Sequence, residues 1–342
     1  MIRLFYTFVL FILFSAFNVN AYEFVKIDEL YNVLEKNHSH SANLRKISFK
    51  GFDFINQLDK NFRLYNSDTK AYLYHQNNLV KSFALPQQNN HNSWKNILTD
   101  VLKIYADQSN KFQGNEKLLE DKILSVLAKN IDSYSRIENT KNEEANLIFD
   151  VFNNVIYIKS NTFYKGFSDD VKKIVYNNNL AEGIIFDLRH NIGGDFNEAI
   201  KLSDLFLDDT LIAYSKEQNE TNYYTSTKGD IFNNKKIIIL TSNKTASAAE
   251  VVTASLSDQS RAVVIGTKTY GKGSLQSVYN MNDQRLYVTS GLIYSPSGKI
   301  IDKNGITPQI CTGIDNSCVI SSKEDTSKDI LLAIDLIKNN LG

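Results

Sequence analysis

Ser247 and Lys272 are the two residues of this sequence whose types and setting favour covalent chemistry. Ser247 lies between two alanines, just before an apolar helical pattern, so its hydroxyl is expected to be exposed at a helix start. A serine hydroxyl needs a general base before it can attack a carbonyl carbon. A lysine amine can act as that base only when burial lowers its pKa and leaves it neutral. Lys272 lies between two glycines and follows an apolar strand pattern, and we expect it to be the base.

Four further residues complete the predicted site. Gln276 would share one face of a strand with Lys272, because strand side chains alternate, and its amide would orient the amine without adding charge. The backbone N–H of Ala248, at the helix start, would face a developing oxyanion. Gly193 and Gly194 could supply a second N–H, since glycine lets the chain approach closely. We find no metal-ligand pattern and expect no metal or other cofactor.

Two other interpretations, a phosphate-binding loop and a histidine-based catalytic triad, are disfavoured by the sequence around Lys272 and Ser247. Residues 266–272 (G-T-K-T-Y-G-K) mimic a phosphate-binding loop, but Gly273 stands where that loop needs serine or threonine to hold magnesium. His190 is the one credible catalytic histidine, yet no G-x-S-x-G elbow surrounds Ser247. Taken singly, each residue is also more often an ordinary turn, helix-start or surface residue.

The elements that must position these residues follow an alternating pattern. From residue 155 onward strand and helix patterns alternate, which predicts an α/β layered core. The expected strands are residues 155–159, 183–186, 236–241 and 262–265, with helices beginning near 168, 197 and 247 and a hairpin at 275–279 and 285–289. Three turns lie at or beyond ends of buried strands, where open α/β sheets place their sites: 187–194, 245–250 and 269–276.

The preceding region has a mainly helical pattern from residue 22 to about residue 130. Alternating residues at 62–65 and 71–74 predict a β-hairpin within it, and Pro86 marks a break before the next helix. The amphipathic stretches are residues 27–34, 94–105, 118–127 and, after a polar linker, 329–341.

The first 21 residues predict export. Arg3 precedes an apolar run at 4–17, and V-N-A at 19–21 is a small-x-small cleavage site, so we expect a signal peptide removed after Ala21. The apolar run is shorter than a membrane-spanning helix requires. We therefore expect a periplasmic or extracellular protein with no stable membrane span after cleavage.

The net charge limits the expected binding partners, and the cysteines indicate the redox compartment. The 342 residues carry 38 basic and 38 acidic side chains, and zero formal net charge disfavours nucleic-acid binding. Cys311 and Cys318 are the two cysteines, and we expect them to form a disulfide in an oxidising compartment.

The three turns, in this order, resemble segments of peptidase family S41, the tail-specific or C-terminal processing peptidases. Residues 187–194 (D-L-R-H-N-I-G-G), 245–250 (T-A-S-A-A-E) and 269–276 (T-Y-G-K-G-S-L-Q) are similar to that family's D-L-R-x-N-P-G-G, S-A-S-A-S-E and F-G-K-G-x-x-Q segments. The separation of 25 positions between Ser247 and Lys272 also agrees with the family. Further similar segments lie at 131–136, 294–298 and 304–308.

The resemblance implies a ClpP/crotonase-like peptidase core in which Ser247 is the nucleophile, Lys272 the base and Gln276 the supporting third residue. It covers roughly residue 118 to the C-terminus. This sequence departs from the family pattern without losing a catalytic group at Ile192, Thr245, Ala249 and Tyr270.

The family usually carries a PDZ domain before the strand at 155–159, but here only residues 137–154 intervene, so we expect the PDZ to be lacking. The expected parts are a signal peptide (1–21), a mainly helical region with a hairpin (22–150), the peptidase core (151–321), and a linker with a C-terminal helix (322–342). The expected function is a secreted serine endopeptidase acting on unfolded or C-terminal segments of proteins. A non-catalytic peptide-binding or scaffold protein on the same fold is the alternative, and homo-oligomerisation stays open.

Overall fold

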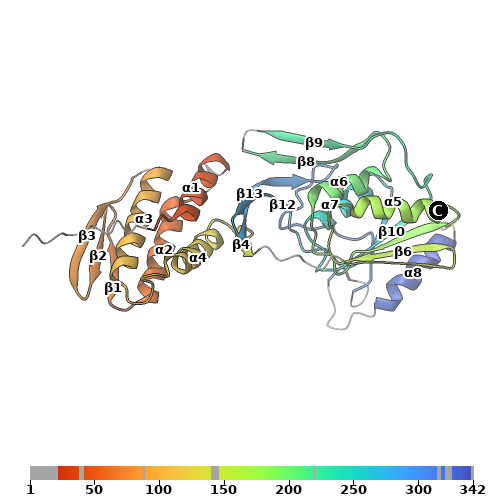
Figure 1. Ribbon diagram of the computed structural model, residues 1–342. Coiled ribbons are helices and arrows are strands. Elements are labelled where there is room, and N and C mark those ends of the chain that lie inside the picture. The colour runs from red at the N-terminus through yellow and green to blue at the C-terminus, as the bar shows by residue number, and fades with distance from the viewer. Residues whose placement is uncertain are drawn as a thin grey trace, which may run out of the picture.

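The computed structural model describes residues 22–37, 42–87, 89–139, 146–218, 220–313, 317–319 and 326–339. Two lobes lie side by side along the long axis of the molecule (Figure 1). The predicted signal peptide, residues 1–21, lies outside the described residues. Within the described ranges, no helix combines the length and the apolarity needed to cross a membrane.

The N-terminal lobe packs four helices beside a three-stranded antiparallel sheet. Its elements are α1 (Val25–Asn37), α2 (Leu44–Leu58), β1 (Phe62–Asn66), β2 (Lys70–His75), β3 (Asn78–Ala84), α3 (His91–Gln108) and α4 (Glu116–Lys129). The three predicted helical stretches and the β1–β2 hairpin are confirmed. Helix α2 and strand β3 were not predicted: β3 is exposed at six of its seven positions, so it lacks the apolar alternation that marks a half-buried strand.

The C-terminal lobe is built on a six-stranded sheet in the order β14-β11-β10-β7-β6-β5. Its strands are β5 (Leu147–Phe152), β6 (Val155–Ser160), β7 (Gly183–Asp187), β10 (Lys236–Thr241), β11 (Val263–Gly266) and β14 (Ile310–Cys311). All neighbours pair in parallel except β5 with β6. The predicted α/β layered core is therefore present.

Helices cover both faces of this sheet, which explains why its central strands are apolar throughout. Ile184 and Phe186 of β7 pack in the cluster that contains α5 (Phe167–Asn177), α6 (Phe196–Asp204) and α7 (Ala248–Asp258). Ile185, on the opposite face, packs with Ala333 and Ile337 of α8 (Thr326–Lys338). Helix α8 begins three residues before the predicted position, and residues 340–342 lie outside the described part of the chain.

A second sheet joins the two lobes. It has the strand order β12-β13-β8-β9, and β4 also pairs with β13. Its strands are β4 (Arg136–Asn139), β8 (Leu211–Glu217), β9 (Thr221–Thr225), β12 (Ser274–Met281) and β13 (Gln284–Tyr294), of which β12 and β13 form the predicted hairpin. Met281, Leu286 and Val288 of this hairpin belong to the core of the N-terminal lobe. Gln276, the site candidate on β12, therefore lies on a hairpin that packs against both lobes.

A buried ion-pair network ties α8 to the first of the three turns. The Arg189 guanidinium donates to both carboxylate oxygens of Asp187, over 2.9 and 2.7 Å, and to Asp329 of α8 over 3.1 Å. Asp187 also accepts a hydrogen bond from the Tyr157 hydroxyl over 2.6 Å. The position of the turn therefore depends on the C-terminal helix.

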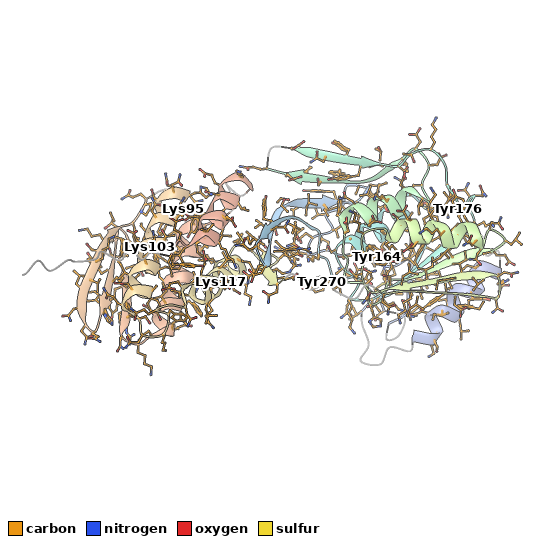
Figure 2. The ribbon with its side chains drawn as sticks, viewed as in Figure 1. Lys95, Lys103, Lys117, Tyr164, Tyr176 and Tyr270 are labelled. Carbon is orange, nitrogen blue, oxygen red and sulfur yellow. A yellow bond between two sulfur atoms is a disulfide. The ribbon has the colours of Figure 1, made fainter. Side chains whose placement is uncertain are left out.

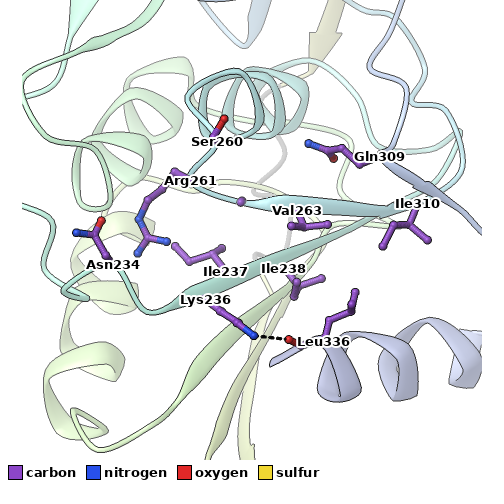
Figure 3. Close-up of a pocket in the computed structure, with 11 residues that line it drawn as sticks. Asn234, Lys236, Ile237, Ile238, Ser260, Arg261, Val263, Gln309, Ile310 and Leu336 are labelled. Carbon is purple, nitrogen blue, oxygen red and sulfur yellow. Dashed lines mark hydrogen bonds between the residues drawn. The ribbon is translucent and has the colours of Figure 1, made fainter. Parts of the chain in front are cut away.

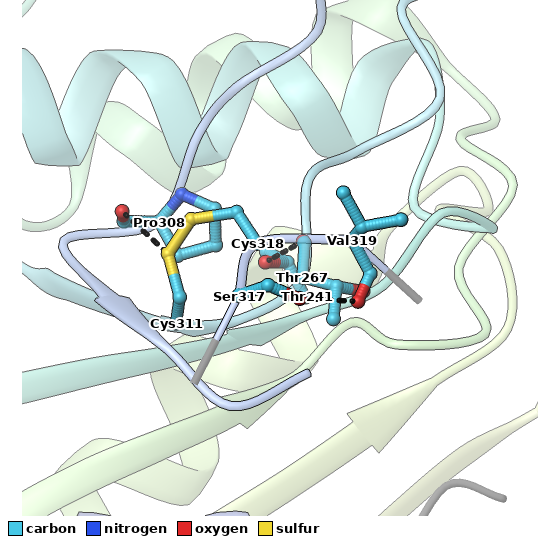
Figure 4. Close-up of a disulfide and its surroundings, with 7 residues drawn as sticks. All are labelled: Thr241, Thr267, Pro308, Cys311, Ser317, Cys318 and Val319. Atoms are coloured by element: carbon cyan, nitrogen blue, oxygen red, sulfur yellow. Dashed lines mark hydrogen bonds between the residues drawn. A yellow bond between two sulfur atoms is a disulfide. The ribbon is translucent and has the colours of Figure 1, made fainter. Parts of the chain in front are cut away.

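The expected disulfide between Cys311 and Cys318 is present (Figure 4). It lies beside β11, where the Cys318 carbonyl accepts a hydrogen bond from Lys268 N over 2.9 Å. Lys268 directly precedes the turn that carries Lys272. The disulfide loop therefore braces the chain just upstream of the candidate base.

Candidate active site

The three turns singled out in the sequence are joined to one another by hydrogen bonds. Ala246 N donates to Asn191 O over 3.0 Å, which ties the serine turn to the glycine turn. Tyr270 N donates to Thr245 O over 2.9 Å, which ties the lysine turn to the serine turn. Tyr270 lies on the side of the C-terminal lobe that faces the N-terminal lobe (Figure 2). All six predicted site residues lie on these turns or on the strand that follows the third one.

Ser247 lies at the sharp transition from the loop after β10 into α7. Its backbone has φ 58° and ψ −124°, a conformation that non-glycine residues rarely adopt and that costs free energy. The side chain is only partly buried. Ala248 begins the helix, so its N–H has no acceptor within α7 and lies at the positive end of the helix dipole. A partly exposed hydroxyl next to such an N–H is suited to attack on a carbonyl.

Gly193 lies directly against this serine. A Cβ at Gly193 would lie 2.7 Å from Ser247 Cβ and 3.0 Å from Ala248 N, and the residue has φ +105°. Only glycine fits this position without displacing the nucleophile candidate. The Gly193 N–H donates to Asn191 Oδ1 over 2.9 Å, so it is already occupied, whereas Gly194 packs on the Phe163 backbone.

Glu250, to which the sequence assigned no role, joins the serine and lysine turns. Its fully buried carboxylate accepts from Ser247 N over 2.9 Å and from Lys272 N over 2.7 Å. It also accepts from Gly271 N over 2.7 Å and from Thr269 Oγ1 over 2.5 Å. Burial raises the pKa of this carboxyl, while the four donors favour its charged form. The serine and the glutamate three positions later form a capping box, a signal that is visible in the sequence.

The Lys272 side chain is half-buried and its pKa is lowered. Burial is the main cause, and the positive charge of Arg136 adds to it, while Glu138 and Glu250 oppose it. Lys272 Nζ lies 5.8 Å from the centre of the Tyr134 ring. Among the residues that the structure describes, no hydrogen bond joins Lys272 Nζ to Ser247 Oγ. The environment thus favours the neutral amine that a general base requires.

Gln276 is held by the segment that enters from the N-terminal lobe. Its Nε2 donates to Tyr134 O over 2.8 Å, and its Oε1 accepts from Arg136 Nη1 over 2.8 Å. Within the described residues its amide makes no hydrogen bond to Lys272. Gln276 is therefore fixed beside the lysine turn by partners that the sequence did not reveal.

His190 makes no hydrogen bond to the predicted site residues among the described residues, and a described pocket of the C-terminal lobe is lined by other residues. The His190 ring has no hydrogen-bond partner among the described residues, and in that part of the chain no group of three His, Cys, Asp or Glu residues could hold a metal ion. A pocket of about 590 Å³ lies between β10, β11 and α8, where Lys236 Nζ donates to Leu336 O over 2.7 Å (Figure 3). None of the predicted site residues lines it.

The fold and these turns define a mixed α/β protein with a serine at a strained strand-to-helix turn and a partly buried lysine beside it. The model of peptidase family S41 matches residues 154–312, so this segment is homologous to that family of serine peptidases. This match contains all three turns.

Relatives in other organisms match less than half of the chain. The carboxy-terminal-processing protease of Bartonella bacilliformis is 38% identical over 132 residues, which cover 38% of this chain and 30% of that protein. The chloroplastic carboxyl-terminal-processing peptidase 2 of Arabidopsis thaliana is 35% identical over 157 residues, 44% of this chain and 30% of that protein. The match thus spans less than a third of the length of these relatives.

A solved structure aligns with the chain over most of its length. A lipoprotein from Streptococcus agalactiae aligns with a TM-score of 0.50 at 15% identity, covering 84% of this chain and 96% of that one. At this identity the likeness extends to the fold alone.

Proposed function

We propose that this protein is a serine endopeptidase that hydrolyses peptide bonds through a Ser247–Lys272 dyad. The observation that carries the proposal is the shared carboxylate of Glu250, which binds the backbone of both residues. One buried carboxyl group thus holds the two turns in a fixed relation, while burial of Lys272 makes its amine lose its proton more readily than in water.

The proposed reaction has two halves. Neutral Lys272 takes the proton of Ser247 Oγ as that oxygen attacks the substrate carbonyl carbon, and the Ala248 N–H donates to the oxyanion. The tetrahedral intermediate collapses when the C–N bond breaks and the lysine ammonium gives its proton to the leaving amine. Water, deprotonated by the same lysine, then attacks the acyl-enzyme, and the ester C–O bond breaks as the lysine ammonium returns the proton to Ser247 Oγ.

Gln276, Gly193 and Gly194 have supporting roles in this proposal. Gln276 limits the space open to Lys272, and Gly193 leaves room for the substrate carbonyl beside Ser247. The second oxyanion donor from the glycine turn is the Gly194 N–H, or the Gly193 N–H once it exchanges Asn191 Oδ1 for the substrate. We also propose that the C-terminal lobe has the ClpP/crotonase-like fold, which the match to peptidase family S41 supports.

The test is cleavage of an unfolded protein, such as reduced and alkylated α-lactalbumin, by matched variants. Ser247→Ala and Lys272→Ala should each abolish cleavage. Lys244→Ala, which removes an exposed lysine from the same loop as Ser247, should cleave at the wild-type rate. Cleavage by both dyad variants at the wild-type rate would exclude the proposal.

A non-catalytic peptide-binding role is the second candidate. The observation that favours it is that Lys272 and Ser247 are not hydrogen-bonded among the described residues. A wild-type protein that binds unfolded chains without cleaving them, and binds them equally as Ser247→Ala, would support this role instead.

We infer further that substrates are recognised without a PDZ domain. Strand β4 ends at Asn139 and β5 begins at Leu147, and of the intervening positions 140–145 lie outside the described residues. The seven positions between the two strands are far too few for a domain. Peptides with a free and with an amidated C-terminus should therefore be cleaved at similar rates. A strong preference for the free carboxylate would contradict this inference.

Export is proposed from the first 21 residues and from the disulfide, which persists in oxidising compartments. Sequencing of the mature N-terminus should find Tyr22 as the first residue. Retention of residues 1–21 in the exported protein would contradict cleavage after Ala21.

A further inference from the structure

Arg136 links the connection between the lobes to the candidate catalytic residues. It begins β4, shortly after α4, and lies outside the segment that matches the peptidase family. Its Nη1 donates to Gln276 Oε1 over 2.8 Å and approaches Tyr134 O over 3.3 Å. Tyr134 O accepts the other end of the same amide. Both ends of the Gln276 amide are therefore fixed by one short segment.

The Arg136 guanidinium is itself held in one orientation. Strand β4 pairs with β13 so that Arg136 lies opposite Tyr287, and the guanidinium carbon lies 4.2 Å from the centre of the Tyr287 ring. Its Nε donates to Glu138 in an ion pair. Stacking on an aromatic face and a charge-assisted hydrogen bond together restrict a planar guanidinium strongly.

The charged groups that act on the Lys272 amine come from two elements. Arg136 and Glu138 lie on β4, and Glu250 lies on α7. The Tyr134 ring faces the amine from the segment before β4. After burial, the Arg136 charge is the largest contribution that lowers the pKa of Lys272, and the two carboxylates raise it. A positive charge at position 136 thus favours the neutral amine.

We propose that Arg136 is a positioning residue for the reaction, which fixes the Gln276 amide and places a positive charge beside the Lys272 amine. This inference rests on the proposed function, because it requires Lys272 to be the general base. It assigns a role in the active site to the segment that connects the N-terminal lobe to the core. Arg136 acts through Gln276 and Lys272 and does not contact the substrate.

The test is the pH dependence of kcat/KM for a quenched fluorescent peptide. Arg136→Gln removes the charge and should shift the acidic limb of the profile upward by about one pH unit, with about a tenfold loss at neutral pH that diminishes at high pH. Arg136→Lys keeps the charge but not the planar fork, so its acidic limb should stay near that of wild type while kcat falls. Glu138→Gln removes a carboxylate that raises the pKa of Lys272, so its limb should move downward.

The controls separate this inference from the proposed function. Arg45→Gln, which removes a half-buried arginine of the N-terminal lobe that bonds the Asp68 carbonyl, should leave the profile unchanged. An acidic limb that is the same in wild type, Arg136→Gln and Glu138→Gln would overturn the positioning role, while inactive Ser247→Ala would still support the dyad. A wild-type protein that cleaves nothing, or an active Ser247→Ala variant, would overturn both. If Arg136→Gln does not fold, the downward shift in Glu138→Gln and the unshifted limb of Arg136→Lys still decide the question.

Discussion

Ser247 and Lys272 donate their backbone N–H groups to the same atom, Glu250 Oε2, over 2.9 and 2.7 Å. The two candidate catalytic residues are therefore coupled through their backbones, although no hydrogen bond joins their side chains in the described structure. A buried carboxylate with four donors is a rigid link, because loss of any one bond would leave a polar group unpaired.

Glu250→Gln should lower kcat/KM by at least about tenfold, because the amide nitrogen cannot accept the hydrogen bonds that one carboxylate oxygen accepts now. The matched control is Glu198→Gln, which alters another buried carboxylate, one that binds Ser168 at the start of α5. Thermal unfolding should detect destabilisation in both variants. Activity should fall only in Glu250→Gln, and wild-type kcat/KM in that variant would contradict the coupling.

Gly193→Ala should abolish cleavage, because the added Cβ would lie 2.7 Å from Ser247 Cβ. Gly229→Ala is the control: Gly229 has a similar φ of +108°, but no atom lies within 4 Å of its added Cβ. Both variants carry the same kind of backbone strain. Peptide cleavage normalised to the folded fraction should therefore separate them, and equal activities would show that the close approach to Ser247 does not matter.

The rate constant kcat/KM should rise with pH through the lowered pKa of Lys272 and then level off. The sign follows from the base: only the neutral amine accepts the Ser247 proton, and burial moves the neutral form to lower pH. A pH–rate profile of the wild-type protein measures this directly. Activity that falls as the pH rises from 6 to 9, in a protein that stays folded, would contradict a lysine base.

Asp329→Asn should destabilise the C-terminal lobe by about 3 kcal/mol, because it leaves the buried Arg189 charge with fewer partners. Asp335→Asn, at an exposed position of the same helix, should have a much smaller effect on unfolding. Urea-induced unfolding of the two variants provides the comparison. Equal midpoints would show that α8 does not stabilise the turn through Arg189.

The sequence predicted elements best where periodicity and burial agree. Residues 236–241 were predicted as a strand and form β10 with the same bounds, because a strand covered by helices on both faces is apolar throughout. Strands β8 and β9 were not predicted. In β9, exposed residues alternate with half-buried ones, and all five side chains are threonine, asparagine or tyrosine, so the strand carries no apolar signal.

Contacts between residues far apart in the sequence could not be predicted from it. The turns could be placed at strand ends, but Arg136 and Gln276 are 140 positions apart, and only the pairing of β4 with β13 brings them together. Gln276 was expected to orient Lys272 directly. Its actual partners lie on a segment whose only sequence signal was the resemblance of residues 131–136 to a family stretch.

The most direct test of the dyad is labelling with a fluorophosphonate, which reacts with activated serines, followed by peptide mass mapping. The wild-type protein should carry a single adduct on Ser247. Ser247→Ala should carry none, and Lys272→Ala should react far more slowly, while Lys244→Ala should react like wild type. An adduct on another serine, or equal labelling rates in wild type and Lys272→Ala, would contradict a Ser247 nucleophile activated by Lys272.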